Sequence, residues 1–164
     1  MIVLDTSIIS TFALIGAMDL LYALFPTDDL GVTPAVYTEL VVGSREGRQF
    51  LQAAVEQVES GRLKLFALTA EEFMQRLRLP TSLGSGEAES IVLCQSRGAA
   101  FVTNDRRARN FCLSEGIEVF DLIEVLRALW RLGVCSKQQV RQLVAEIESK
   151  EGAVIRRKGA IFAK

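Results

Sequence analysis

The chain has 164 residues, of which 49% are hydrophobic and 24% are charged, which suits one domain with a buried core. Its 19 basic and 20 acidic residues nearly cancel, so any nucleic-acid contact must depend on a local basic patch rather than on net charge. Histidine is absent, which excludes the commonest general base and the imidazole ligands of zinc and copper sites. A metal bound by this chain would therefore need oxygen ligands, which hard cations such as Mg²⁺ or Mn²⁺ prefer.

Two further features bear on location. The three cysteines are Cys94, Cys112 and Cys135; they lie in apolar patterns without Cys-x-x-Cys spacing, as expected for buried thiols in a reducing cytosol. The apolar segment 8–25 has no basic region before it and contains Asp19. We therefore expect a core helix broken near Gly16, neither a signal sequence nor a membrane span, and a cytoplasmic protein.

The first seven residues form an apolar run that stops at Asp5 and is followed by Thr6 and Ser7. This pattern predicts a short buried strand that ends at Asp5. Open α/β sheets hold their sites at the carboxyl edge of the strands. Asp5 can equally cap the next helix, because short oxygen side chains accept hydrogen bonds from free helix N–H groups. This stretch alone leaves both interpretations open.

A second short strand is expected over residues 30–33, and a helix follows it. Thr33 is placed as N-cap and Pro34 as the first helical residue. Glu39 on this helix lies in an apolar stripe with no basic residue three or four positions away. If buried, its carboxylate needs a metal or a distant arginine; the alternative is a solvated surface glutamate.

The middle of the chain continues the alternation of helix and strand. Residues 43–61 are expected to form a helix and residues 63–68 a strand. A capping box of Thr69 and Glu72 then opens another helix. A polar loop leads to residue 86.

Acidic residues mark the start of the next predicted helix. Ser85 is its expected N-cap, and Glu87 and Glu89 lie in or near its first turn. Acidic residues there often only complement the helix dipole. Gly98 is the expected C-cap.

The strand predicted over 99–102 ends in Thr103, Asn104 and Asp105, as the first strand ended at Asp5. Three arginines, Arg106, Arg107 and Arg109, begin the following helix. A strand at 117–120, a helix after Asp121, a helix at 136–148 and a basic segment at 153–164 complete the chain.

Strands that alternate with helices predict an α/β fold with three α/β/α layers around a central parallel sheet. Asp5 and Asp105 would end strands, while Glu39 and Glu87 would lie near the starts of helices that leave the same edge. Four converging carboxylates raise one another's pKa. A divalent cation would offset that repulsion.

The chain resembles the PIN-domain nucleases, specifically the small prokaryotic members that act as toxins in toxin–antitoxin pairs. The resemblance is carried in order by IVLDTS (2–7), PAVYTEL (34–40), GEAESI (86–91) and VTND (102–105). It implies a PIN-like, Rossmann/flavodoxin-like domain over residues 1–150 and a basic C-terminal tail over 151–164. The family's positions fall on these residues: the metal ligands Asp5, Glu39, Glu87 and Asp105, the supporting hydroxyls Thr6 and Thr103, and Glu89 as an alternative ligand.

The resemblance implies a metal-dependent endoribonuclease that uses Mg²⁺ or Mn²⁺ to hydrolyse RNA phosphodiesters. It also implies an antitoxin protein as partner and a homodimer. Arg106, Arg107 and Arg109 would attract the phosphate backbone. Because such contacts do not read bases, the choice of RNA over DNA follows from the resemblance alone.

Two rival functions remain. A haloacid-dehalogenase-like phosphohydrolase would use Asp5 as nucleophile, but that pattern needs a second aspartate two residues later, where this chain has Ser7. A non-catalytic PIN-like module that binds RNA or protein is favoured by Asn104, where close relatives often show a second acid. The four intact carboxylates oppose this second rival.

Overall fold

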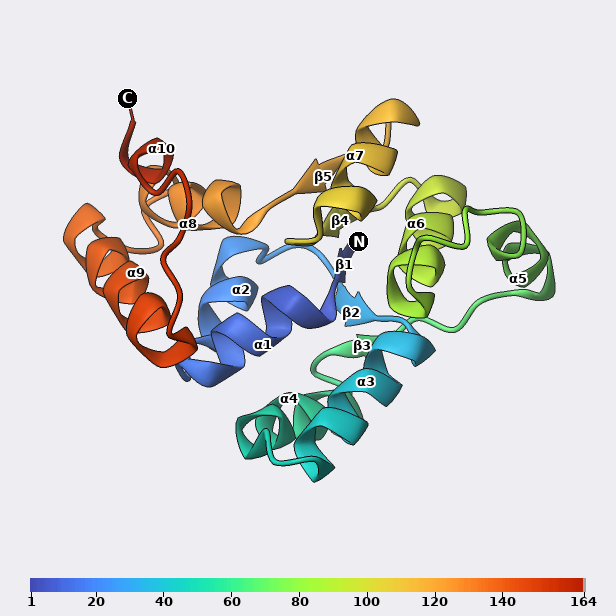
Figure 1. The fold of residues 1–164 in the computed structure, drawn as a ribbon, viewed down its shortest axis with the longest axis horizontal. Helices are drawn as coiled ribbons and strands as arrows, with labels where there is room; N and C mark the ends of the chain where they lie inside the picture. Colours follow the sequence, from blue (N-terminus) through green and yellow to red (C-terminus); the bar gives the residue numbers. More distant parts are fainter. Residues whose placement is uncertain (164) are drawn as a thin grey trace.

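The computed structural model describes residues 1–163, and within them five parallel strands form one sheet in the order β3-β2-β1-β4-β5 (Figure 1). Every neighbouring pair is parallel, so the carboxyl ends of all strands share one edge. The central strand β1 pairs with β2 on one side and β4 on the other. The strands are β1 (Ile2–Leu4), β2 (Leu30–Val32), β3 (Lys64–Leu65), β4 (Ala100–Val102) and β5 (Val119–Phe120).

Helices connect and cover these strands. In chain order they are α1 (Thr6–Leu14), α2 (Met18–Leu24), α3 (Pro34–Arg45), the 3-10 helix η1 (Gln49–Leu51), α4 (Gln52–Glu59), α5 (Ala70–Arg76), α6 (Ser85–Arg97), α7 (Arg106–Ser114), α8 (Leu122–Arg131), α9 (Lys137–Glu151) and α10 (Gly159–Phe162). No single helix in residues 1–163 is long and apolar enough to cross a membrane; α1 and α2 reach that length and composition only as a pair bent by 119°.

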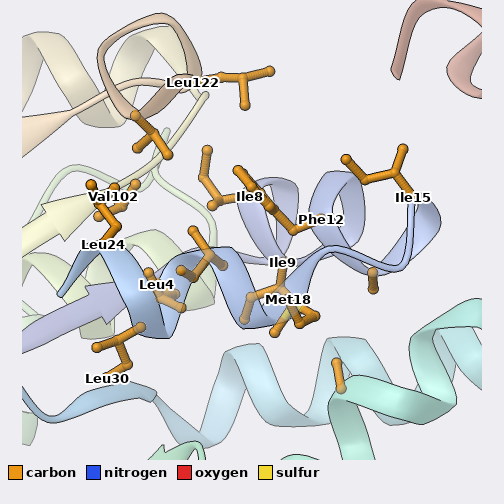
Figure 2. Packing of buried hydrophobic residues seen from close by; sticks show 14 of the residues in the cluster. Leu4, Ile8, Ile9, Phe12, Ile15, Met18, Leu24, Leu30, Val102 and Leu122 are labelled. Atoms are coloured by element: carbon orange, nitrogen blue, oxygen red, sulfur yellow. The ribbon is translucent and has the colours of Figure 1, made fainter. Parts of the chain in front are cut away.

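The two faces of the sheet bury separate sets of side chains, because neighbouring residues of a strand point to opposite faces. Leu4 and Val102 face the larger cluster, which includes Ile8 and Phe12 of α1 as well as residues of α2, α8 and α9 (Figure 2). Val3 faces the smaller cluster with residues of α6 and α7. The predicted α/β/α architecture is thereby confirmed.

Several predicted element boundaries are confirmed, and others differ for local reasons. Gly16 does break the first helical segment, with a φ of 64°. The helix predicted over 43–61 is wrong: α3 continues to Arg45, Gly47 then takes a φ of 106°, and η1 and α4 follow. Only two residues of the strand predicted over 63–68, Lys64 and Leu65, pair with β2, and β3 lies at one edge of the sheet.

The predicted basic C-terminal segment contains a structured element. α9 extends to Glu151, beyond the expected end at residue 148, and stops at Gly152 in the left-handed conformation. The short helix α10 packs against α8, with Ile161 fully buried. Lys164 lies outside the described residues.

An ion pair between the buried Glu72 and the partly exposed Arg97 joins α5 to α6. The capping box predicted at Thr69 is confirmed, and its Glu72 also receives two hydrogen bonds from Arg97, at 2.8 Å from Nε and 2.7 Å from an Nη. The Arg97 guanidinium holds the pKa of the Glu72 carboxyl at about 2, well below its usual 4.5. Ionised Glu72 therefore stabilises the contact between the two helices.

We predict that Glu72→Gln lowers the free energy of unfolding by about 2 kcal/mol at neutral pH. This is less than the pKa shift alone would imply, because Arg97 keeps 31% of its side chain exposed to screening water. Because the pKa is depressed in the folded state, the stabilisation is present above pH 4.5 and is lost as pH falls towards 2. Urea unfolding at neutral and acidic pH measures it.

The exposed neighbour Glu71 provides the matched control. Glu71→Gln removes the same charge from the same helical turn and should leave the unfolding curve close to that of the unmodified protein. An equal loss in both variants, or a Glu72→Gln effect that persists at low pH, would contradict the role of the ion pair.

Candidate functional site

The fold brings the four predicted carboxylates to the carboxyl edge of the sheet. Asp5 directly follows β1, and Asp105 lies three residues beyond the end of β4, the neighbour of β1. Glu39 is in the second turn of α3, the helix that leaves β2, and Glu87 is in the first turn of α6. All four therefore lie near the end of the central strand.

The electrostatics of Glu87 show that these carboxylates are close enough to influence one another. Burial raises the pKa of the Glu87 carboxyl, and the negative charges of Asp5, Asp105 and Glu39 raise the pKa further. The backbone N–H of Gly84 opposes this by donating a hydrogen bond to the Glu87 carboxylate. The four groups therefore share one electrostatic field.

Asp5 is the most firmly held of the four and is only 5% exposed. It accepts hydrogen bonds from the Thr6 N–H at 2.9 Å, the Ser7 hydroxyl at 2.8 Å and the Thr103 hydroxyl at 2.8 Å. The predicted capping role is thus confirmed, since Asp5 is the N-cap of α1. The bond from Thr103 also ties β4 to β1, and Thr103 in turn accepts from the Asp105 N–H at 3.0 Å.

Glu39 reaches the same edge because α3 packs closely against the start of α6. Its carboxylate accepts a hydrogen bond from the Thr6 hydroxyl. At Gly86 an added Cβ would lie 3.1 Å from Glu39 Oε1 and 3.0 Å from a methyl of Val36. The missing side chain of Gly86 therefore leaves the space that the Glu39 carboxylate and its helix occupy.

The remaining carboxylates bind backbone donors. Asp105 is the N-cap of α7 and accepts from the Ala108 N–H at 2.8 Å. Glu87 closes the first turn of α6 onto Gly84, so the N-cap of α6 is Gly84 and the expected cap at Ser85 is wrong. A glycine can take this role because the hydrogen bond comes from its own backbone.

Glu89, the alternative ligand, is directed elsewhere. Its carboxylate accepts a hydrogen bond from the Ala35 N–H at 2.9 Å in the first turn of α3, and it lies 3.9 Å from Arg76. Glu87, by contrast, responds to the charges of Asp5 and its neighbours. The geometry favours Glu87 over Glu89 as the member of the carboxylate group.

The side chains do not form a complete metal site in this arrangement. Within residues 1–163, no group of at least three His, Cys, Asp or Glu side chains is positioned to hold a metal ion. The donor chemistry nevertheless fits a hard divalent cation, because carboxylate and hydroxyl oxygens are the preferred ligands of such ions. None of the four carboxylates takes part in an ion pair within the described part of the chain. Their role as metal ligands remains a prediction.

The three arginines expected near the site differ in their surroundings. Arg109 is engaged by two carboxylates, 3.4 Å from Asp121 and 3.0 Å from Glu124. Arg106 and Arg107 are exposed on the first turn of α7.

Ser7 was expected only as a turn or capping residue. Its hydroxyl also accepts a hydrogen bond from the Asn104 N–H at 3.2 Å, which adds a second contact between the ends of β1 and β4.

Comparison with known proteins supports the class that the fold and this edge define, an α/β protein with acidic residues gathered at the carboxyl edge of a parallel sheet. A family model described as a PIN domain matches residues 1–159. No curated protein matches the chain. The chain belongs to the PIN-domain family, whose members are generally nucleases that use divalent metal ions.

We predict that Gly86→Ala weakens Mn²⁺ binding several-fold and lowers the unfolding free energy of the metal-free protein by about 1 kcal/mol at most, because crowding against buried Val36 works against the helix preference of alanine. The new methyl group would displace the Glu39 carboxylate, whereas alanine is favoured over glycine inside a helix by about 1 kcal/mol. Isothermal titration calorimetry and thermal unfolding measure the two effects. Gly159→Ala is the control, because nothing lies within 4 Å of an added Cβ there; unchanged affinity in Gly86→Ala would argue against Glu39 as a ligand.

Proposed function

We propose that this PIN-domain protein is a divalent-metal-dependent endoribonuclease that hydrolyses RNA phosphodiesters with Mg²⁺ or Mn²⁺. The observation that carries the proposal is the shared field of the carboxylates at one sheet edge, without a basic partner among the described ion pairs. In this proposal the metal ligands are Asp5, Glu39, Glu87 and Asp105. A cation would relieve the repulsion that the protein itself leaves in place.

The chain's own residues would orient these ligands. Thr6 links two of them, because its N–H donates to Asp5 and its hydroxyl donates to Glu39. Thr103 fixes the other oxygen of Asp5 and receives the N–H of Asp105. A bound divalent ion supplies Lewis acidity at the phosphate and lowers the pKa of water. In the absence of histidine, no imidazole competes for the role of general base.

We extend the proposal to the toxin of a toxin–antitoxin pair, with an antitoxin protein as partner and a homodimer as the assembly. This extension rests on the sequence resemblance alone. A cytoplasmic location belongs to the same proposal, and it is supported by three buried free thiols, which suit a reducing compartment.

The second candidate function is a non-catalytic module that binds RNA or protein. Two observations favour it: Asn104 stands exposed where a second acid would strengthen a metal site, and three of the carboxylates already serve helix starts. A phosphohydrolase with Asp5 as nucleophile gains no support, because Ser7 occupies the position of its second aspartate and donates to Asp5.

We predict that the purified protein cleaves a mixed pool of single-stranded and structured RNA in Mn²⁺ or Mg²⁺ but not with a chelator. Asp5→Asn should reduce cleavage by about 100-fold or more, because it removes a ligand charge from the metal. Asparagine caps helices about as well as aspartate does, but its amide NH₂ cannot accept from the Ser7 and Thr103 hydroxyls. We therefore expect a loss of about 1–3 kcal/mol in unfolding free energy, with the protein still folded. Gel analysis of the RNA and urea unfolding measure both effects.

Asp29→Asn is the matched control, because Asp29 is exposed and precedes β2, away from the carboxyl edge. It should cleave RNA as the unmodified protein does. Cleavage that persists in the chelator would contradict metal dependence. An inert protein that also binds no Mn²⁺ in calorimetry would favour the non-catalytic module.

A further inference from the structure

A cleft rich in arginine opens beside the carboxylate group. It has a volume of about 600 Å³ and lies between α7, α8 and the C-terminal segment, defined here as residues 153–163. A second hollow of about 440 Å³ shares Asn104, Arg106 and Arg156 with it. Since Asn104 and Arg106 directly flank Asp105 in the chain, both hollows begin next to the candidate metal ligands. The cleft's basic lining residues are Arg106, Arg109, Arg127, Arg156 and Arg157.

The two acidic side chains that line this cleft share one arginine and are outnumbered by the five arginines of the lining. Asp121 and Glu124 both pair with Arg109, and Glu124 also receives the Asp121 N–H. Arg127 donates to the carbonyl oxygen of Ala160 and so fixes α10. Arg109 and Arg127 are thus engaged in contacts within the protein.

Three other arginines keep their guanidinium groups available. In residues 1–163 no hydrogen bond or ion pair engages the side chains of Arg106, Arg156 and Arg157. All three are exposed. With its acids paired to Arg109, the cleft presents net positive charge to solvent.

The arginine pair of the C-terminal segment is held in place on both sides. Glu148 of α9 accepts from the Ile155 N–H at 2.9 Å and binds the Lys158 ammonium at 2.9 and 3.0 Å. Between these anchors Arg157 has a φ of 60°, a left-handed conformation that a non-glycine residue keeps only when its surroundings impose it. The backbone that carries the two arginines is therefore held in place by the fold.

The end of the segment is anchored as well. The indole N–H of Trp130 donates to the carbonyl oxygen of Ile161 at 2.8 Å, and the Ile161 side chain is fully buried. The dark red segment in Figure 1 accordingly returns from α9 to lie against α8. A flexible tail would lose more conformational entropy on binding than this fixed segment does.

We propose that this cleft binds the phosphate backbone of the RNA strand that enters the carboxylate site, with Arg106, Arg156 and Arg157 as the phosphate contacts. The inference rests on the proposed function in taking RNA as the polyanion. Guanidinium groups pair with phosphate oxygens through two parallel hydrogen bonds. A positive groove that tracks the backbone gives affinity without base preference. It would also hold the strand against the repulsion of the acidic centre.

The test measures binding of a fluorescein-labelled oligouridine by fluorescence anisotropy in chelator, over a range of salt concentrations. We expect Arg156→Ala/Arg157→Ala to weaken binding by about 10-fold. The slope of log affinity against log salt should become shallower by about 1.4, because each phosphate contact with a single strand contributes about 0.7. Arg156→Ala alone should give about half of that slope change and leaves the backbone at Arg157 untouched.

The charge-matched control is Arg45→Ala/Lys64→Ala, which removes two exposed basic residues from the end of α3 and from β3. Its affinity and slope should stay close to those of the unmodified protein. Fluorescence of Trp130, the single tryptophan, verifies that α10 remains docked in each variant. Equal affinities and equal salt slopes in the arginine variants and the control variant would overturn the proposal.

Failure of this inference and failure of the proposed function have different signatures. If RNA binding in chelator depends on the arginines but no cleavage occurs in Mn²⁺, the binding cleft is supported and the nuclease function is contradicted. If cleavage is normal but RNA affinity is unchanged by substitution of Arg156 and Arg157, the binding cleft is contradicted and the nuclease function is supported.

Discussion

The parallel pairing of β1 with β4 is the constraint on which the site depends. It places the ends of the two strands side by side, and the buried hydrogen bond from Thr103 to Asp5 fixes their relative position at that edge. The same strands supply Leu4 and Val102 to the larger core and Val3 to the smaller one. Core packing and the position of the acidic group are consequently set by one register, and a slip of one residue would turn every side chain to the opposite face.

Three carboxylates at this edge cap helices with the oxygen atoms that would bind a metal ion in the proposed function. Asp5 and Asp105 satisfy free N–H groups at the starts of α1 and α7, and Glu87 does so at α6. These hydrogen bonds, together with the positive ends of the helix dipoles, offset part of the repulsion among the negative charges. Capping and function are therefore compatible interpretations, and the caps explain how the acidic group can exist without an arginine between its members.

Local signals in the sequence predicted the elements that create the edge. The apolar runs that end at Asp5 and Thr103, and the Thr33 cap before Pro34, depend on neighbouring residues, and the structure has them as expected. Failures arose where the outcome depends on distant contacts or on one backbone angle. The extent of β3 is set by its pairing with β2, which involves only Lys64 and Leu65, and Gly47 interrupts the predicted helix with a positive φ.

The arginine cleft could not be found from sequence for the same reason. It depends on α10 docking through Ile161 and Trp130, residues 31 positions apart in the chain, and on Arg109 taking up the acids of another helix. Glu89 was equally ambiguous, since only the approach of α3 reveals that it binds the Ala35 N–H. The residue types in the sequence were enough to identify the candidate site residues. Which of them lie together depends on packing between distant segments, which the sequence does not show.

The distance along the chain between β1 and β4 has a consequence for protein synthesis. Asp5 and Thr103 are 98 residues apart, so β1 can pair with β2 early but with β4 only after nearly two thirds of the chain has been translated. Contacts of such long range form late and slowly, because loop closure must precede them. A ribosome-bound chain that has not yet released Asp105 cannot assemble the acidic edge, so the candidate site forms only in the later part of translation.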